Sequence, residues 1–250
     1  METKHLRVLS YNIHKGFTRG NSRLVLRQIR DAIRATHADL VFLQEVQGQH
    51  EEHGRKHEEW PAEPQFEYLA DSIWPHYAYG KNAVYEAGHH GNAILSKYPF
   101  SFFENIDVSS SKYERRGLLH GVIQVPHSDQ HIHAVCVHLG LLETDRQNQV
   151  RRICERIETH VTHSHPLVIA GDFNDWRGRS TQPLSTQLEV REAFLEATGR
   201  HARTFPSWFP ALRLDRVYYR GAKLESARVL NESPWNELSD HAALYVELGL

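Results

Sequence analysis

The stretch LVIAGDFND, Leu167 to Asp175, decides the fold of this chain. Its first four residues are a continuous apolar run, which is typical of a strand buried on both faces. Gly171 then allows a sharp turn, and Asp172, Asn174 and Asp175 follow it. A carboxylate and a carboxamide two residues apart at the rim of a rigid sheet can bind a hard metal ion or orient a water and a phosphate oxygen. In isolation, such a motif is also typical of an Asx-rich turn that closes a strand.

Four other strand ends in this chain also finish in polar residues. The strand Leu6 to Ile13 carries Asn12, and the apolar run Leu40 to Leu43 leads straight into Gln44 and Glu45. An acid that follows four consecutive apolar residues is poorly placed for solvent unless the strand ends at a cleft. Glu45 is therefore the second anchor of the predicted site.

His138 and Asp215 mark two further strand ends. His138 in a cleft can donate to a phosphate oxygen or protonate a leaving group, whereas elsewhere it simply bonds a neighbouring loop. Asp215 lies within an apolar strand, where a carboxylate needs a partner. The candidate partner is His241 in the sequence Ser239, Asp240, His241, because an aspartate that fixes one histidine tautomer makes the other ring nitrogen a general base. Ser-Asp-His is also a common turn composition.

The remaining pattern predicts alternating helices and strands. Apolar residues at helical spacing predict helices over Arg23 to Thr36, Phe66 to Trp74, Thr144 or Asp145 to Val161, and Leu184 to Ala197. Short runs of β-branched and aromatic residues between Tyr77 and His138 predict an antiparallel meander, and Ala243 to Leu248 a final strand. The segment Gln47 to Trp60 shows no apolar periodicity and is predicted as a polar loop. His53 and His57 in it are spaced as a helical metal-binding pair, but no third ligand lies nearby.

Composition sets the class of protein. The chain has 250 residues, 40% of them hydrophobic, and shows no linker or short repeat, so residues 1–250 are predicted to form one domain. No apolar stretch approaches the roughly 20 residues of a membrane span, so we expect a soluble, cytoplasmic monomer without stable membrane insertion. Cys136 and Cys154 are expected to be small buried hydrophobes rather than a disulfide. Most of the 19 histidines are expected to be solvated on polar loops.

Net charge limits the candidate partners. The formal charge is −2 at pH 7 and the sequence pI is about 6.8, which removes the simplest argument for a nucleic-acid binder, a strongly basic face. A metal-dependent nuclease stays possible, because only the local field at its cleft matters. Arg115 and Arg116 can pair with phosphate, although an isolated arginine is more often a plain surface charge.

Eight short motifs occur in the order found in the endonuclease/exonuclease/phosphatase superfamily. They are YNIHKG from Tyr11, LQEV from Leu43, GNAILSKYP from Gly91, RRG from Arg115, VHLG from Val137, GDFND from Gly171, LDRVYY from Leu214 and SDH from Ser239. The chain thus resembles DNase I, the abasic-site endonucleases, neutral sphingomyelinases and inositol polyphosphate 5-phosphatases, and is most similar to a bacterial branch of this group. The resemblance implies a DNase I-like α/β fold, a four-layered α/β/β/α sandwich of two mixed sheets flanked by helices.

The resemblance also implies a metal site. By similarity, Glu45 is the principal ligand of Mg²⁺ or Mn²⁺, and Asn12 and Asp240 lie close to the metal or to the scissile phosphate. Clustered carboxylates would repel one another without a cation, which is consistent with this expectation.

The remaining motif residues imply catalytic and substrate-binding roles. Asp172 and Asn174 would position the attacking water and a phosphate oxygen. His241, oriented by Asp215, would act on the nucleophile or stabilise the pentacovalent phosphorus. His138 matches a position that is histidine in DNase I-like and sphingomyelinase-like members. Arg116, Asn12 and Asn174 complete the expected substrate-binding set.

The expected activity is divalent-metal-dependent hydrolysis of a phosphodiester, and two substrate classes stay open. A nucleic acid would use Lys15, Arg19, Arg115 and Arg116 on its backbone, and aromatic residues such as Trp176, Trp208 and Phe209 for base or sugar contacts. A phospholipase C-like or sphingomyelinase-like enzyme would use the aromatic loop TFPSWFP, from Thr204, as an apolar rim at a lipid surface. Ordinary packing over the sheet edge is the alternative explanation of this loop. A catalytically inactive scaffold is a third possibility, but it would have lost a metal carboxylate or histidine, and none is missing.

Overall fold

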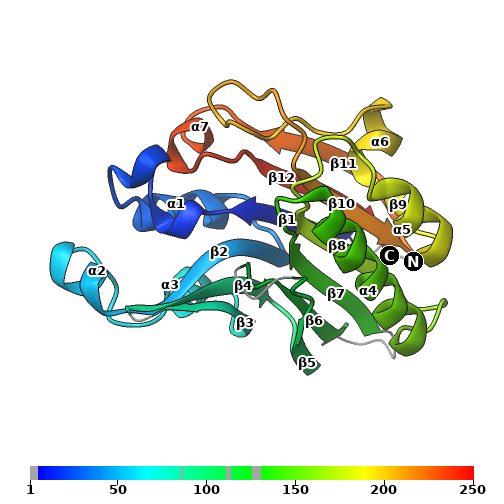
Figure 1. Ribbon diagram of the computed structural model, residues 1–250, viewed down its shortest axis with the longest axis horizontal. Coiled ribbons are helices and arrows are strands. Elements are labelled where there is room, and N and C mark those ends of the chain that lie inside the picture. Colours follow the sequence, from blue (N-terminus) through cyan, green and yellow to red (C-terminus); the bar gives the residue numbers. More distant parts are fainter. Residues whose placement is uncertain (1–4, 86, 111–113, 126–130) are drawn as a thin grey trace.

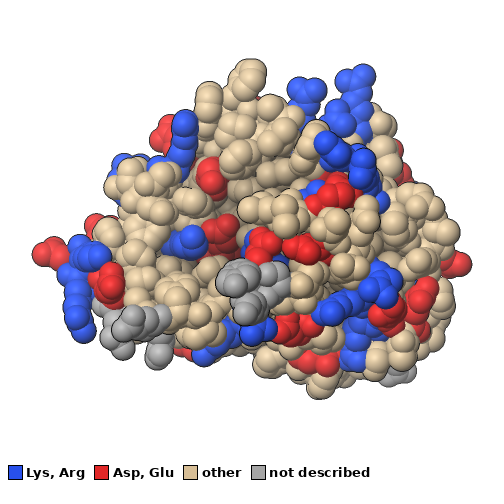
Figure 2. Space-filling model, viewed as in Figure 1, with Lys and Arg blue, Asp and Glu red and all other residues tan. Residues whose placement is uncertain are grey.

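The computed structural model describes residues 5–85, 87–110, 114–125 and 131–250. Within these residues the strands form two six-stranded sheets that pack face to face, with helices outside them (Figure 1). This arrangement confirms the predicted four-layered α/β/β/α sandwich. Acidic and basic side chains are interspersed over the face drawn in Figure 2, as the small net charge suggests.

The first sheet is mixed. Its strands are β1 (His5–Asn12), β2 (Leu40–His50), β3 (His76–Tyr85), β4 (Gly88–Ser96), β11 (Lys223–Leu230) and β12 (Ala243–Gly249). They lie in the order β11-β12-β1-β2-β4-β3. β1 and β2 are parallel and the other neighbours are antiparallel, so the ends of β1 and β2 meet at one edge.

The second sheet repeats this plan. Its strands are β5 (Phe100–Asp107), β6 (Gly117–Gln124), β7 (His131–His138), β8 (Leu167–Asp172), β9 (Arg191–Glu192) and β10 (Asp215–Arg220). They lie in the order β5-β6-β7-β8-β10-β9, and β7 and β8 are the parallel pair. The apolar run that begins at Leu167 therefore forms the central strand β8.

Helices cover both outer faces. The helices are α1 (Leu26–Ala35), α2 (Glu51–Lys56), α3 (Gln65–Ala70), α4 (Glu143–His160), α5 (Thr181–Leu188), α6 (Ala193–Thr198) and α7 (Trp235–Leu238), with the 3-10 turns η1 (His14–Gly16) and η2 (Arg19–Asn21). α1, α3 and α7 pack against the first sheet, and α4 and α5 against the second. None of the described helices is long and apolar enough to cross a membrane.

Alternation along the strands builds the core. In β8, Val168 joins the apolar layer between the sheets, whereas Ile169 packs under the α4 and α5 helices. Val8 and Leu9 of β1 divide in the same way between the inner layer and the α1 side. Each central strand is thus buried on both faces, which explains its continuous apolar sequence. Cys136 and Cys154 are buried and free, as expected.

Several predicted boundaries are wrong. Helix α1 begins at Leu26 rather than Arg23, because Thr18 bonds the backbone of Arg23 and closes a turn there. The predicted helix over 184–197 is interrupted at Glu189, whose φ of 55° is left-handed, and becomes α5, β9 and α6. The predicted polar loop over 47–60 instead holds the end of β2 and helix α2.

Two tertiary features also differ from the sequence-based expectations. The meander between Tyr77 and His138 is divided, since β3 and β4 belong to the first sheet and β5, β6 and β7 to the second. The edge strand β11 was not predicted. The expectation of mostly solvated histidines is also wrong, because the exposed histidines among the described residues are His5, His37, His160 and His163.

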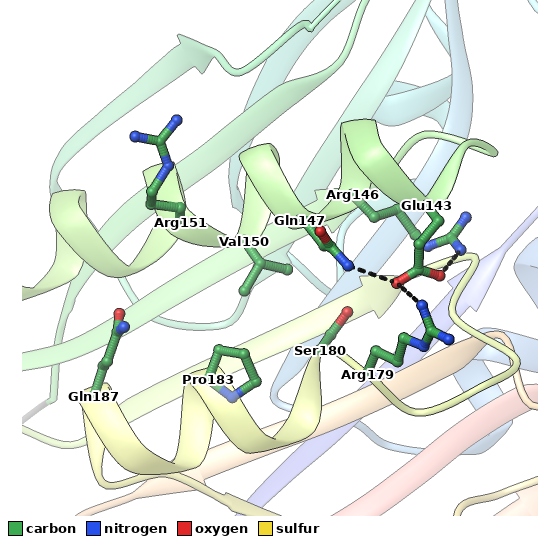
Figure 3. A pocket seen from close by; sticks show the side chains of 9 residues that line it. All are labelled: Glu143, Arg146, Gln147, Val150, Arg151, Arg179, Ser180, Pro183 and Gln187. Carbon is green, nitrogen blue, oxygen red and sulfur yellow. Dashed lines mark hydrogen bonds and ion pairs between the residues drawn. The ribbon is translucent and has the colours of Figure 1, made fainter.

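Helices α4 and α5 lie side by side and enclose a cavity of about 200 Å³ (Figure 3). Its carboxylate, Glu143, accepts hydrogen bonds from Arg146 and Gln147 and lies 3.5 Å from Arg179. Arg146 also donates to the carbonyls of Gly140 and Leu141. These polar groups are paired with one another, so we assign them to holding the loop between β7 and α4.

Candidate active site

Strand pairing places His138, Asp172 and Asp215 side by side at one edge of the second sheet. In register, His138 of β7 is the partner of Asp172 of β8, and Asp172 is the partner of Asp215 of β10. The preceding residue, Gly171, has a φ of 147°, and a Cβ there would lie 1.9 Å from the carbonyl oxygen of Val137. Glycine is therefore required for β8 to approach β7 at this point.

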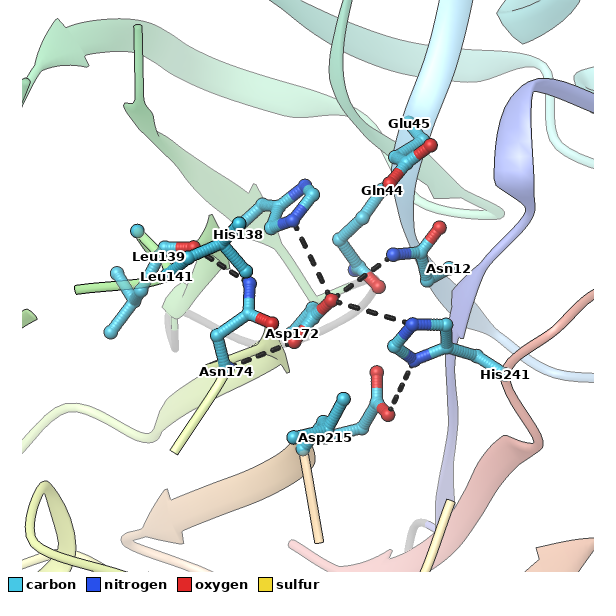
Figure 4. A network of polar contacts seen from close by, with 12 residues as sticks. Asn12, Gln44, Glu45, His138, Leu139, Leu141, Asp172, Asn174, Asp215 and His241 are labelled. Atoms are coloured by element: carbon cyan, nitrogen blue, oxygen red, sulfur yellow. Dashed lines mark hydrogen bonds and ion pairs between the residues drawn. The ribbon is translucent and has the colours of Figure 1, made fainter. Parts of the chain in front are cut away.

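Asp172 is the centre of a polar network (Figure 4). Its Oδ2 accepts a hydrogen bond from Asn12 Nδ2 at 3.1 Å and lies 3.5 Å from His138 Nε2 and 3.7 Å from His241 Nε2. Its Oδ1 accepts a hydrogen bond of 2.9 Å from the backbone N–H of Asn174. Because Asn12 belongs to β1 and His241 to the loop before β12, the network joins the two sheets.

The charges of this network are coupled. His241 Nδ1 lies 2.9 Å from Asp215 Oδ2. Burial opposes protonation of His241, but Asp215 and Asp172 outweigh it and raise the pKa of His241 to about 10. Burial raises the pKa of Asp172 to about 6, with Asp215 adding to the shift and His241 opposing it. At neutral pH these shifts leave Asp172 as a carboxylate and His241 as an imidazolium.

His138 behaves differently from His241. It is 7% exposed and faces Asp172, but burial lowers its pKa well below 6.5, and the nearby positive charges of Arg116 and His241 lower it further. It is neutral at pH 7. The site thus contains one charged and one neutral imidazole on opposite sides of the same carboxylate.

Glu45 occupies a bulge rather than a strand end. Strand β2 continues to His50, and its pairing with β4 shifts register between Leu43 and Val46, next to Glu45. The φ of Glu45 is 56°, a left-handed value that costs free energy for a residue with a side chain. His14, Lys15 and Asn174 also have a positive φ. Four of the eight described non-glycine residues with a positive φ therefore lie at this site. The prediction of a cleft at Glu45 agrees with its position, although the predicted strand end is wrong.

A group of oxygen and nitrogen atoms beside Glu45 fits a hard cation. Glu45 Oε2 lies 3.7 Å from Lys15 Nζ and 3.9 Å from His14 Nδ1, and His14 Nδ1 lies 3.4 Å from Asp240 Oδ2. Glu45 Oε2 and His14 Nε2 are both buried and have no hydrogen-bond partner among the described residues. Unpaired buried acceptors of this kind are satisfied when they coordinate an ion.

A second candidate metal set is less suitable. Ligand atoms of Asp172, Asp215 and His241 lie within 4.8 Å of one another. The bond between Asp215 and His241 Nδ1, however, already uses two of these groups, and Asp172 accepts bonds from Asn12 and Asn174. Side chains that are hydrogen-bonded to one another gain less from an ion than Glu45 Oε2, which accepts no hydrogen bond among the described residues. We therefore favour Glu45 and Asp240 as the place for a metal.

Glu45 of the first group and Asp172 and His241 of the second line one cavity of about 500 Å³, whereas Asp240 and Asp215 do not line it. Its lining includes Lys15, Glu45, His90, Arg116, His138, Asp172, Asn174, Trp176 and His241. Arg116 is bonded to Glu114 at 2.6 Å, and Asn174 donates to the carbonyl of Leu139 at 2.9 Å. Arg115 instead pairs with Asp107 at 3.0 Å and does not line this cavity.

His14 and His90 were not in the predicted site, and Lys15 was predicted only as a contact to a nucleic-acid backbone. His14 and Lys15 follow Asn12 after one residue, Ile13, and their polar cluster at a strand end was a usable signal. His90 lies in β4 opposite Gln47, and burial lowers its pKa to about 4. Nothing local in the sequence distinguishes His90 from a loop histidine, because its place depends on the pairing of β4 with β2.

Three comparisons bear on this geometry. The model of the Endonuclease/Exonuclease/phosphatase family matches residues 9–241. The protein YbhP of Escherichia coli K12 is 48% identical over 244 residues, which cover 98% of this chain and 96% of YbhP. An endonuclease/exonuclease/phosphatase from Beutenbergia cavernae has a TM-score of 0.80 at 20% identity, over 99% of this chain and 72% of its own.

A further solved structure is that of D. rerio TDP2 complexed with a single-strand DNA product. It has a TM-score of 0.73 at 18% identity and covers 99% of this chain and all of its own. At this identity the two solved structures show the shared fold, and the family match extends over nearly the whole chain.

Proposed function

The chain belongs to the endonuclease/exonuclease/phosphatase family, and we propose that it is a divalent-metal-dependent phosphodiesterase. One observation carries the proposal: Glu45, whose Oε2 has no hydrogen bond among the described residues, lines the same cavity as Asp172 and His241. Such a cavity provides a place for a phosphate between a cation and an activated water. A scaffold without activity would not need the strained backbone of Glu45.

Glu45 and Asp240 would hold Mg²⁺ or Mn²⁺, with Asn12 next to them. Asn12 Oδ1 accepts a hydrogen bond from the backbone of His14, and its amide donates to Asp172, so Asn12 fixes the distance between the metal ligands and the catalytic carboxylate. When bound, the ion would neutralise the nonbridging phosphate oxygens and the leaving oxygen.

Asp172 and Asn174 would act on the nucleophile. Asp172 has a pKa of about 6 and is a carboxylate at neutral pH, so it can orient the attacking water and accept its proton. Asn174 is held by Leu139 and completes the water position.

Positive charge and neutral donors would stabilise the pentacovalent phosphorus. His241 remains an imidazolium because Asp215 is bonded to its other nitrogen, and it would face the developing negative charge. His138, being neutral, would donate one hydrogen bond to a phosphate oxygen, and Arg116 would bind a second oxygen.

The test is hydrolysis of bis-p-nitrophenyl phosphate by the purified protein with Mg²⁺, Mn²⁺ or a chelator. We expect metal-dependent turnover that is lost in Glu45→Gln and kept in Glu155→Gln, an exposed acid on α4. Turnover that persists in the chelator, or wild-type rates in Glu45→Gln, would refute the proposal. Plasmid DNA, abasic duplex, sphingomyelin and phospholipids in the same assay then compare the substrate classes.

A further inference from the structure

Six exposed apolar side chains lie on three loops at the mouth of the active-site cavity. We name them the apolar rim: Leu141, Leu142, Trp176, Trp208, Phe209 and Leu212, which are between 40% and 69% exposed. Leu141, Trp176 and Leu212 line the cavity itself. An exposed apolar cluster beside a functional site indicates a surface that binds a protein, a membrane or an apolar ligand.

The loop that carries Trp208 and Phe209 is built to present them. Phe205 and Leu212 pair as a short antiparallel bridge, so the residues between them form a tight tip. Beneath the tip, Ser207 Oγ donates to the carbonyl of Ser239 at 2.6 Å, and the Ser207 N–H donates to that of Asp240 at 2.8 Å. The tip is thus tied to the active-site segment before β12, and its two aromatic rings project from a fixed base.

The segments that carry or contact Trp176, Trp208 and Phe209 are basic, whereas the loop of Leu141 and Leu142 lies beside Glu114 and Glu143. Residues 14–23, 176–182 and 199–214 contain eight lysines and arginines and no acidic residue, although the whole chain has a net charge of −2. Arg19 lies 5.1 Å from the ring of Trp208, and Arg177 lies 4.5 Å from that of Trp176. In Figure 2, Lys and Arg side chains flank the tan surface at the upper edge of the view, where the loop between α6 and β10 lies in Figure 1. Arginines beside exposed tryptophans match the headgroup layer of an anionic membrane.

We propose that the apolar rim docks on the surface of a bilayer that contains anionic phospholipids and brings a lipid phosphodiester to the cavity. This inference rests on the proposed function, since it names the substrate class of the same site. Nucleic acid fits the rim less well, because Leu141, Leu142 and Leu212 offer neither a flat ring for base stacking nor a partner for phosphate. A bilayer accepts leucine and tryptophan side chains together.

Vesicle flotation of the full chain in a chelator tests docking without turnover. The vesicles contain phosphatidylethanolamine and phosphatidylglycerol, or phosphatidylcholine alone. We expect the wild type to float with the anionic vesicles, and Trp208→Ser/Phe209→Ser to lower the bound-to-free ratio about tenfold or more. The matched control is Phe102→Ser/Phe103→Ser, which changes two aromatic residues of β5 that are 51% and 48% exposed and should float as the wild type does.

The outcomes separate the two proposals. Equal flotation of both variants, or no flotation of the wild type, overturns rim docking. A third outcome also overturns it: the wild type binds a labelled single-stranded oligonucleotide but no vesicles, and the rim variant loses the oligonucleotide. The rim is then a nucleic-acid surface. Turnover of bis-p-nitrophenyl phosphate by the wild type without vesicle binding overturns only the docking inference. Rim-dependent flotation of a protein that hydrolyses no diester refutes the proposed function and leaves the docking surface standing.

Discussion

Replacing His133 by asparagine should flatten the dependence of stability on pH between pH 7 and pH 5. His133 is the middle ring of a chain of three imidazoles, two of which, His120 and His133, are buried. Its Nδ1 lies 2.9 Å from His120 Nε2, and its Nε2 lies 3.2 Å from His165 Nδ1. His120 is 2% and His133 5% exposed. Burial lowers the pKa of both rings to about 4, and their neighbouring positive charges add to the shift.

The sign follows from linkage between protonation and folding. An unfolded histidine has a pKa near 6.5, so below that pH the unfolded chain binds a proton that the folded chain refuses. The stability that neutral His133 contributes is fully present above pH 6.5 and is lost as the pH falls toward 4. At roughly 1.4 kcal/mol per pH unit, acidification from pH 7 to pH 5 costs about 2 kcal/mol for this ring.

The assay is urea unfolding followed by circular dichroism at both pH values. We expect the wild type to lose about 2 kcal/mol more than His133→Asn, whatever stability the variant has at pH 7. The matched control is His37→Asn, an exposed histidine with a φ of 54° that asparagine tolerates, and it should lose as much as the wild type. Equal losses in His133→Asn and wild type would refute the reasoning.

Three further predictions concern the site. Asp215→Asn should lower kcat on bis-p-nitrophenyl phosphate by about 10³-fold or more with little change in KM, because His241 loses the carboxylate that holds it charged. A kcat close to that of the wild type would exclude this role of Asp215. Gly171→Ala should destabilise the fold by at least about 3 kcal/mol, since the alanine Cβ would meet the carbonyl of Val137. An unchanged urea midpoint would contradict this prediction. Arg116→Met should raise KM about tenfold and change kcat less, and steady-state kinetics with the opposite pattern would argue against ground-state phosphate binding.

The strand ends were the predictable part of this site. Asn12, His138 and Asp172 follow apolar runs, and parallel strands deliver such residues to a common edge. Asp215 and His241 were paired by the argument that a buried carboxylate needs a partner, and they lie 2.9 Å apart. Each of these inferences used a short local pattern together with one general rule of sheet geometry.

What could not be predicted depends on register. The bulge that directs Glu45 into the cavity arises where the pairing of β2 with β4 shifts register. No residue type in LQEV predicts this shift. His90 reaches the site through the same pairing, and the buried histidines of β6 and β7 become neighbours only across strands. The residues of the edge strand β11 are exposed or half-buried. Its sequence therefore lacks the continuous apolar run that identifies a central strand.

The position of the site between two sheets has a physical consequence. The metal ligands proposed here, Glu45 and Asp240, belong to the first sheet and its loops, whereas Asp172 belongs to the second. Asn12 links them directly, because its side-chain amide donates to Asp172 and its backbone carbonyl accepts a hydrogen bond from the hydroxyl of Ser239. The separation between the proposed metal ligands and Asp172 is therefore set by the apolar layer that holds the sheets apart, in which Phe42 and Val168 pack. Since close-packed interiors deform little, this layer fixes the separation more firmly than loops could, and the loops are left free to vary the surface that the substrate meets.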